Sequence, residues 1–154
     1  MAEERPQPVD ILAAMRREHR RMKDAVCALR RREHDRAEGL DQLRDGITRY
    51  ARSVETVLYD CLIERGGPAA MVGREGYVEH DLLTTLLQHL DHERNKAGDE
   101  WHARLRVLGE LLQHHFSKEE RLVFGAIEQA FEPEEQARLS QRFEQSLRQA
   151  GISA

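Results

Sequence analysis

Residues 101–126 read WHARLRVLGELLQHHFSKEERLVFGA, and their spacing predicts a helix with one buried face. Alternating steps of three and four residues keep side chains on the same side of a helix. Besides apolar residues, this face carries a histidine and a glutamate; its members are Trp101, Leu105, Leu108, Leu112, His115, Glu119, Leu122 and Ala126. An ionised carboxylate among apolar neighbours costs several kcal/mol unless an opposite charge accompanies it. We therefore expect a cation beside this glutamate.

Three further stretches repeat the pattern. They predict buried faces made of Leu12, Met15, His19, Met22, Val26 and Leu29, of Leu40, Leu43, Ile47, Tyr50, Val54, Val57 and Cys61, and of His80, Leu83, Leu87 and Leu90. Helices with such faces, joined by short connections, pack side by side around a common axis. The fold class expected is all-α: an antiparallel up-down-up-down four-helix bundle with an additional C-terminal helix.

Capping and helix-breaking residues set the expected boundaries. The first helix runs from an Asp10 N-cap to about residue 32, and the second covers about 39–65. Gly66, Gly67 and Pro68 end it, and Gly73 and Gly76 are expected to prolong the break, so the third helix covers about 77–94. Asp99 is expected to cap a fourth helix that runs to about residue 131. Pro133 opens the last helix.

The domain organisation that follows has three parts: a flexible tail over 1–8, the bundle over 9–131, and a C-terminal helix over 132–154 packed on its outside. The chain has 154 residues, of which 34% are charged, and a net charge of −4. No apolar run is long enough to span a bilayer, and the arginines of the first helix alternate with its buried face. We expect a cytoplasmic protein with buried, reduced cysteines and with neither a nucleic-acid nor a membrane partner.

Histidine and carboxylate side chains on buried faces predict a metal centre. His115 and Glu119 are four residues apart and leave one helix face together, while His80 comes from the neighbouring helix. Two histidines and one carboxylate with open positions form the ligand set of non-haem iron proteins. His19 enters from the first helix and is placed to bind a second ion that shares Glu119.

Two segments of the chain align without gaps. Residues 50–59 read YARSVETVLY, and residues 115–124 read HFSKEERLVF. Glu-His dipeptides also occur in the first and third helices, at Glu18-His19 and Glu79-His80. The chain therefore resembles two related helical hairpins with a site between them.

With an isolated histidine in each hairpin and the His-x-x-x-Glu motif at 115–119, residues 9–131 resemble the hemerythrin-like (HHE cation-binding) family. That resemblance implies an antiparallel four-helix bundle around a carboxylate- and oxo-bridged di-iron centre, which binds a small diatomic or peroxide ligand. Residue by residue, His80, His115 and Glu119 match ligands of one iron, and His19 matches a ligand of the other.

The second helix departs from the family pattern, because the expected histidine is Tyr50 and the expected glutamate is Val54. Four outcomes remain open. Tyr50 binds iron as a phenolate, Tyr50 hydrogen-bonds a metal-bound water, Glu55 replaces the missing carboxylate, or the second position is empty and the centre is mononuclear.

The function expected is that of a non-haem iron protein that binds, senses or detoxifies dioxygen, peroxide or nitric oxide. Reversible oxygen carriage fits less well, because it requires two irons to share the electrons. Zinc or manganese at His80, His115 and Glu119 is a further possibility. The alternative from a different class is a metal-free helical bundle that serves as a structural or interaction module.

Overall fold

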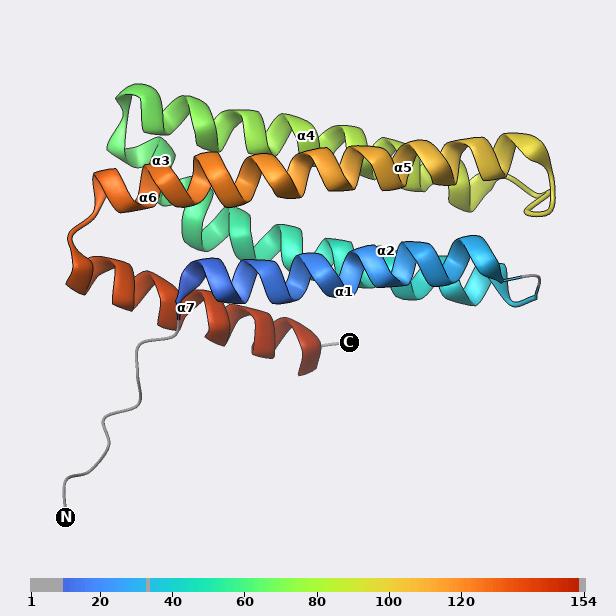
Figure 1. Ribbon diagram of the computed structural model, residues 1–154, viewed down its shortest axis with the longest axis horizontal. Helices are drawn as coiled ribbons and strands as arrows, with labels where there is room; N and C mark the ends of the chain where they lie inside the picture. Colours follow the sequence, from blue (N-terminus) through green and yellow to red (C-terminus); the bar gives the residue numbers. More distant parts are fainter. Residues whose placement is uncertain (1–9, 33, 153–154) are drawn as a thin grey trace, which may run out of the picture.

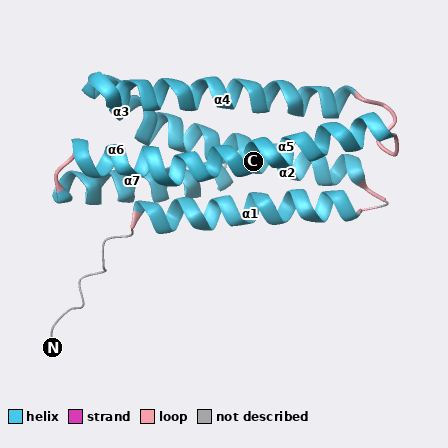
Figure 2. Ribbon diagram, turned by 45° about the horizontal axis from the view of Figure 1, so that its top comes forward, coloured by secondary structure: helices cyan, strands magenta, loops and turns pink. Residues whose placement is uncertain are grey.

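The computed structural model describes residues 10–32 and 34–152, and this part of the chain is helical, with no strand (Figure 2). The predicted tail, 1–8, lies outside the described residues. The elements are α1 (Ile11–Arg31), α2 (Arg36–Val54), η1 (Glu55–Tyr59), α3 (Asp60–Arg65), α4 (Gly67–His92), α5 (Asp99–Lys118), η2 (Glu119–Val123), α6 (Phe124–Ala130) and α7 (Pro133–Ile152). The η segments are π-helical turns within two continuous rods, α2–η1–α3 and α5–η2–α6.

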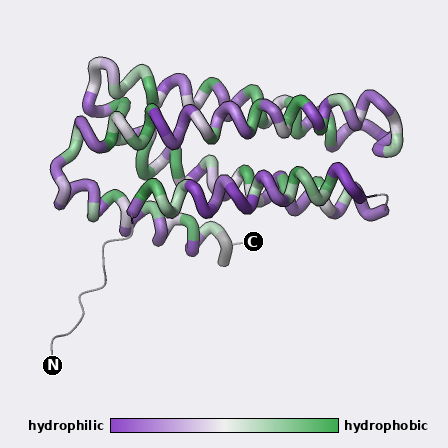
Figure 3. Tube along the Cα trace, in the orientation of Figure 1, coloured by the Kyte–Doolittle hydropathy of each residue, from purple (hydrophilic) through white to green (hydrophobic). Residues whose placement is uncertain are grey.

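The rods lie alongside one another in a helical bundle. α1 packs against α2 and α5, and α4 packs against α5, α2 and α3. The α1–α2 and α4–α5 connections lie at one end of the molecule, and the α3–α4 and α6–α7 connections lie at the other (Figure 1). α7 packs against α2, η1 and α1. Hydrophobic and hydrophilic residues alternate along each helix, as a bundle with a shared core requires (Figure 3).

Most helix ends lie near their predicted positions. The Asp10 carboxylate accepts a hydrogen bond of 3.0 Å from the Leu12 N–H at the start of α1. α2 begins at Arg36, a little earlier than predicted. Asp99 is the first residue of α5 rather than its cap, which is Gly98. Pro133 opens α7 as predicted.

The third helix begins at Gly67 and not near Tyr77, so Gly73 and Gly76 lie inside α4. Gly66, with φ 78°, already supplies the sharp turn between α3 and α4. The two inner glycines allow close packing: a Cβ on Gly73 would lie 2.8 Å from the Tyr59 carbonyl oxygen, and one on Gly76 would lie 2.4 Å from the Tyr59 ring. Their role is close helix contact rather than termination.

The π turns shift the buried face of both rods. A π turn holds more residues than an α turn, so the residues that follow it are rotated about the axis. Beyond Glu119, Leu122 is 38% exposed, against prediction, and Val123 and Ile127 are buried instead. Cys61, beyond η1, is only half-buried, while Leu62 is fully buried.

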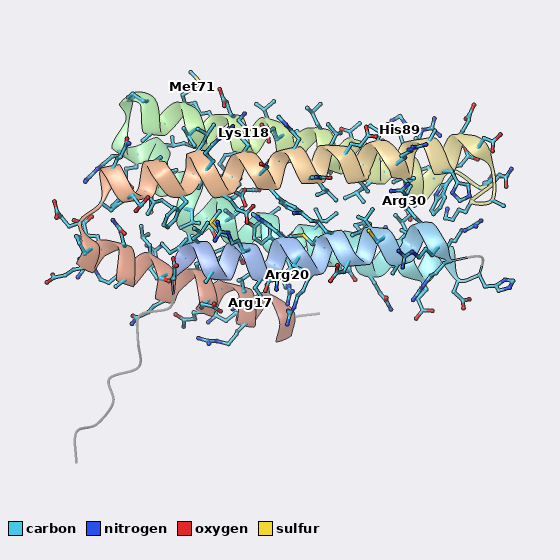
Figure 4. All side chains as sticks on the ribbon, viewed as in Figure 1. Arg17, Arg20, Arg30, Met71, His89 and Lys118 are labelled. Atoms are coloured by element: carbon cyan, nitrogen blue, oxygen red, sulfur yellow. The ribbon has the colours of Figure 1, made fainter. Side chains whose placement is uncertain are left out.

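On the surface of α1, the arginines lie where the sequence predicts them, whereas a cysteine does not. Arg16, Arg17, Arg20 and Arg21 are exposed on α1. Arg17, labelled in Figure 4, donates a hydrogen bond of 2.8 Å to Glu144 of α7. Cys27 is exposed, so the expectation of a buried thiol there is wrong, because Cys27 lies beside the buried face of α1 and not on it.

Along the described residues, the structure has no helix long and apolar enough to cross a membrane.

Candidate metal centre

A polar cluster lies in the bundle core at the level of the two π turns. Its six side chains are all buried: His19 from α1, Tyr50 from α2, Tyr59 from η1, His80 from α4, His115 from α5 and Glu119 from η2. Every one of the four long rods contributes to it, so helices far apart in sequence meet at one point.

Three of these residues have the arrangement of a metal-binding set. One ligand atom from each of His80, His115 and Glu119 lies within 4.8 Å of the other two. The two histidine Nε2 atoms are 3.1 Å apart, and His115 Nε2 is 3.0 Å from Glu119 Oε2. The helical spacing of His115 and Glu119 places both side chains on the inner face of the same rod.

Glu119 lies between two groups of donors. Its Oε1 accepts hydrogen bonds from the Tyr50 hydroxyl and from His19 Nε2, the latter 2.9 Å away. Its Oε2 accepts one from the Tyr59 hydroxyl and faces His115. His19 Nε2 also lies 2.7 Å from the Tyr50 hydroxyl. One carboxylate thus presents one oxygen to each half of the cluster.

Each histidine has an acidic residue behind it. Glu79 accepts a hydrogen bond from His115 Nδ1 and another of 2.7 Å from Lys118 Nζ. The carboxylate of Glu55 is 3.5 Å from His80 Nδ1, and that of Glu120 is 3.8 Å from His19 Nδ1. A carboxylate that accepts a hydrogen bond from Nδ1–H favours the tautomer whose Nε2 lone pair is free for a metal, and it fixes the ring orientation. Of the three histidines, His115 alone has a hydrogen bond to the carboxylate at its Nδ1.

The charges of the cluster are strongly coupled. Burial alone raises the pKa of Glu119, but hydrogen bonds from His115 and His19 outweigh it and hold that pKa well below its usual range. Burial lowers the pKa of His115, but hydrogen bonds to Glu119 and Glu79 raise it to about 9. The hydrogen bond from His115, followed by that from Lys118, lowers the pKa of Glu79 to about 2 against the opposing effect of its burial.

Both cluster tyrosines keep their protons in this arrangement. Burial, and then the negative charge of Glu119, raise the pKa of Tyr50 and of Tyr59 well above the usual value. Ionisation of either phenol therefore requires an additional positive charge close to its oxygen, which a bound metal ion supplies.

The structure brings five of the six predicted site residues into the cluster: His19, Tyr50, His80, His115 and Glu119. The sixth, Glu55, lies at the far side of the His80 ring, away from the convergence point. Its carboxylate faces His80 Nδ1, 3.5 Å away.

Two residues of the site were missed by the sequence reasoning. Tyr59 was noted only as the last residue of the aligned segment 50–59, since the π turn that rotates it toward Glu119 has no spacing signature. Gly76 was the available signal, because it leaves room for the Tyr59 ring. Glu79 was noted only as part of a Glu-His dipeptide, although a carboxylate beside a histidine is a common outer partner of a metal ligand.

The residues present fit a cation. Two imidazole Nε2 atoms, both turned inward at 3.1 Å, share at most one proton if both rings are neutral, whereas a metal ion satisfies both lone pairs. Nitrogen and carboxylate donors of this type suit iron, zinc and manganese.

A cavity leads from the surface to this cluster. It has a volume of about 300 Å³, lies between α2 and α4, and reaches Tyr50, His80 and His115. A second hollow at the cluster, next to Tyr59 and Gly76, measures only about 10 Å³. The larger cavity is therefore the approach to the cluster that the described residues leave open.

A helical bundle that encloses histidines and a shared carboxylate has the architecture of a metal-binding protein. Residues 10–127 match the model of the hemerythrin HHE cation binding domain, which covers well over half of the chain. The chain belongs to this family. Neither the comparison with curated proteins nor the comparison with solved structures gives a match.

Proposed function

We propose that this protein is a non-haem iron protein that binds, senses or detoxifies dioxygen, peroxide or nitric oxide. The observation that supports the proposal best is the convergence of His80, His115 and Glu119 on one buried point beside an open cavity. These three residues are the first iron site. Two histidines and a carboxylate leave several coordination positions for small ligands.

The proposed scaffold is an antiparallel up-down-up-down four-helix bundle. Its support is the pairing of α1 with α2, of α4 with α5 and of α1 with α5, together with connections that alternate between the two ends (Figure 1). In such a bundle, ligands project inward from rigid helices, which holds their geometry.

The second half of the centre is proposed to hold a second ion through His19, Tyr50 and Glu119. Support comes from the carboxylate, because Glu119 presents one oxygen to this half and the other to His115. Tyr50 would hold the ion as a phenolate, because a ferric charge next to the hydroxyl would offset the raised pKa of this group. In the di-iron form, these residues would hold the second ion of an oxo-bridged pair; without His19 and Tyr50 as ligands, the centre would be mononuclear.

Iron, when bound, supplies electrons and open coordination positions for dioxygen, peroxide or nitric oxide. The chain's own residues orient and protect that chemistry. Glu79 holds the His115 ring by accepting a hydrogen bond from its Nδ1–H, and the Tyr59 hydroxyl donates a hydrogen bond to Glu119. Phe116 stacks on His19 with ring centroids 4.0 Å apart and excludes water from that side. Tyr50 stands where the family has a histidine, and this change favours redox reactions or sensing over reversible oxygen carriage. We also propose that the protein acts in the cytoplasm.

The deciding experiment is metal content per chain by elemental analysis, with an absorption spectrum of the same oxidised sample. Two irons per chain and a broad phenolate-to-iron band support the binuclear centre, provided that Tyr50→Phe loses the band and no longer reaches two irons per chain. Tyr77→Phe is the matched control, because the Tyr77 hydroxyl donates to Asp60 at the surface, 2.6 Å away, and not to the cluster.

The same experiment separates the other outcomes. One iron that survives Tyr50→Phe indicates a mononuclear site at His80, His115 and Glu119. Stable loading of zinc or manganese in place of iron reassigns the ion. No metal after anaerobic reconstitution with ferrous iron overturns the proposal in favour of a metal-free interaction bundle.

A further inference from the structure

The cavity between α2 and α4 is much larger than a diatomic ligand needs. Its volume is about 300 Å³. An apolar protein cavity of about 150 Å³ already admits benzene, and pockets for organic ligands begin at about 300 Å³. A site that served only dioxygen, nitric oxide or hydrogen peroxide would leave most of this space to water.

The wall of the cavity changes character with depth. Its floor consists of Tyr50, His80 and His115, whose polar atoms belong to the metal cluster. Its middle is apolar and buried, and is formed by Met22, Ile47, Leu83, Leu87, Leu112 and Phe116. Its mouth is polar and exposed, and includes Thr48, Thr84 and Gln88. A molecule that satisfies all three zones has an apolar body with one polar end at the floor.

The charges of the lining disfavour an anionic ligand. His115 on the floor is paired with the carboxylates of Glu79 and Glu119. The other basic residues of the lining are Arg44 and Arg52, against three acidic residues, Glu55, Asp81 and Asp91. The guanidinium of Arg44 is already neutralised, since it lies 2.8 Å from Asp41 and 3.2 Å from Asp91. The negative Glu119 also lies next to the floor residues. An uncharged polar end is therefore preferred there.

We infer that this cavity binds an uncharged amphiphile, namely an alkyl or aryl body with a single hydroxyl or hydroperoxyl end that reaches Tyr50, His80 and His115. Binding of the body requires no metal, whereas the role of the bound molecule as substrate rests on the proposed iron centre. The substrate class is then an organic oxygen compound rather than a free diatomic gas.

The test uses the metal-free full-length protein and 1-octanol as the probe, followed by calorimetry and NMR. We expect saturable binding whose affinity rises about fourfold per methylene from butanol to octanol, as burial of apolar surface predicts. Intermolecular NOEs should connect the carbon-1 protons to His80, and the terminal methyl group to Thr48 or Gln88. Octanoate should bind more weakly than octanol.

Substitutions at the mouth test the location. Thr84→Trp, and Thr48→Trp from the facing helix, place an indole over the cavity and should weaken octanol binding by at least about tenfold, because the indole takes the place of ligand contact area. Thr85→Trp is the matched control, since Thr85 is exposed on the same helix but does not line the cavity.

Absence of saturable octanol binding, the reversed orientation, tighter binding of octanoate, or equal binding to Thr84→Trp and Thr85→Trp each overturns the inference. Failure of the iron proposal is seen separately, in the metal content, and leaves the octanol titration decisive for the cavity.

Discussion

The α4–α5 half of the centre presents two histidines, whereas the α1–α2 half presents one histidine and one tyrosine. In the first half, His115 has a complete hydrogen bond to Glu79, which is fixed in turn by Lys118. In the second half, His19 Nδ1 has no hydrogen-bond partner, and Glu120 is 3.8 Å away. Both halves share Glu119. The comparison indicates that the first half contains a ligand ring held in place by a carboxylate, whereas the histidine of the second half has no such support.

The largest expected difference between the halves is in metal loading. His115→Ala removes an Nε2 donor from the first half and should abolish iron binding, because two donors do not hold the ion. His19→Ala should remove only the second ion and leave about one iron per chain. Elemental analysis after reconstitution measures both, and circular dichroism confirms that the variants fold.

Unchanged loading in His115→Ala would remove the histidine from the ligand set. In a metal-free bundle, the same substitution would leave metal content unchanged at zero and would lower stability, since the carboxylates of Glu119 and Glu79 lose their partner. Equal losses in the two variants would contradict the unequal halves.

The second difference concerns the residue behind the ligand. Glu79→Gln should lower the metal affinity by about 10–100-fold, because the His115 ring loses the carboxylate that fixes its tautomer. Glu75→Gln is the matched control, since Glu75 also contacts Lys118, at 2.9 Å, but does not contact His115. Competition with a chelator gives both affinities. A loss of the same size in the control would assign the effect to Lys118.

Sequence periodicity predicted the polar residues of the buried faces more reliably than the apolar residues beyond them. His19, Tyr50, His80, His115 and Glu119 all lie on predicted buried faces and all reach the cluster. Their positions depend on α-helical spacing up to the π turns, which a pattern of three and four reproduces. The all-helical fold follows from the same regularity.

Spacing failed where the backbone departs from the α-helix. Leu122 is exposed and Val123 is buried because η2 adds a residue to its turn, and the sequence carries no periodic mark of that change. Gly76 was assigned to a break because glycine disfavours helices, yet it lies inside α4 to admit the Tyr59 ring. Long-range packing decides both positions.

Tyr59, in the rod α2–η1–α3, donates a hydrogen bond to the Glu119 oxygen that faces His115. Its ring fits against α4 because residue 76 is glycine, and this fit can be tested by measuring stability. Gly76→Ala should destabilise the protein by about 1–3 kcal/mol, because its Cβ would lie 2.4 Å from the Tyr59 ring. Gly46→Ala, where a Cβ meets nothing within 4 Å, should instead stabilise it by about 0.5–1 kcal/mol through helix propensity. Urea unfolding measures both. Stabilisation by Gly76→Ala would show that the Tyr59 ring is free to move.

The smallest expected effect is the pH dependence that the Glu79–His115 pair gives to the metal-free protein. The lowered pKa of Glu79, about 2, contributes stability above the usual carboxyl value of about 4.5 that is lost as the pH falls toward 2. The raised pKa of His115, about 9, contributes stability below about 6.5 that is lost as the pH rises through 9. The pair therefore stabilises the folded protein most between about pH 4.5 and 6.5. The contribution is less than about 1 kcal/mol, because solvent reaches Glu79. Melting temperatures from pH 5 to 9 should fall less in Glu79→Gln than in the unmodified chain, whereas parallel profiles would place the pH dependence elsewhere.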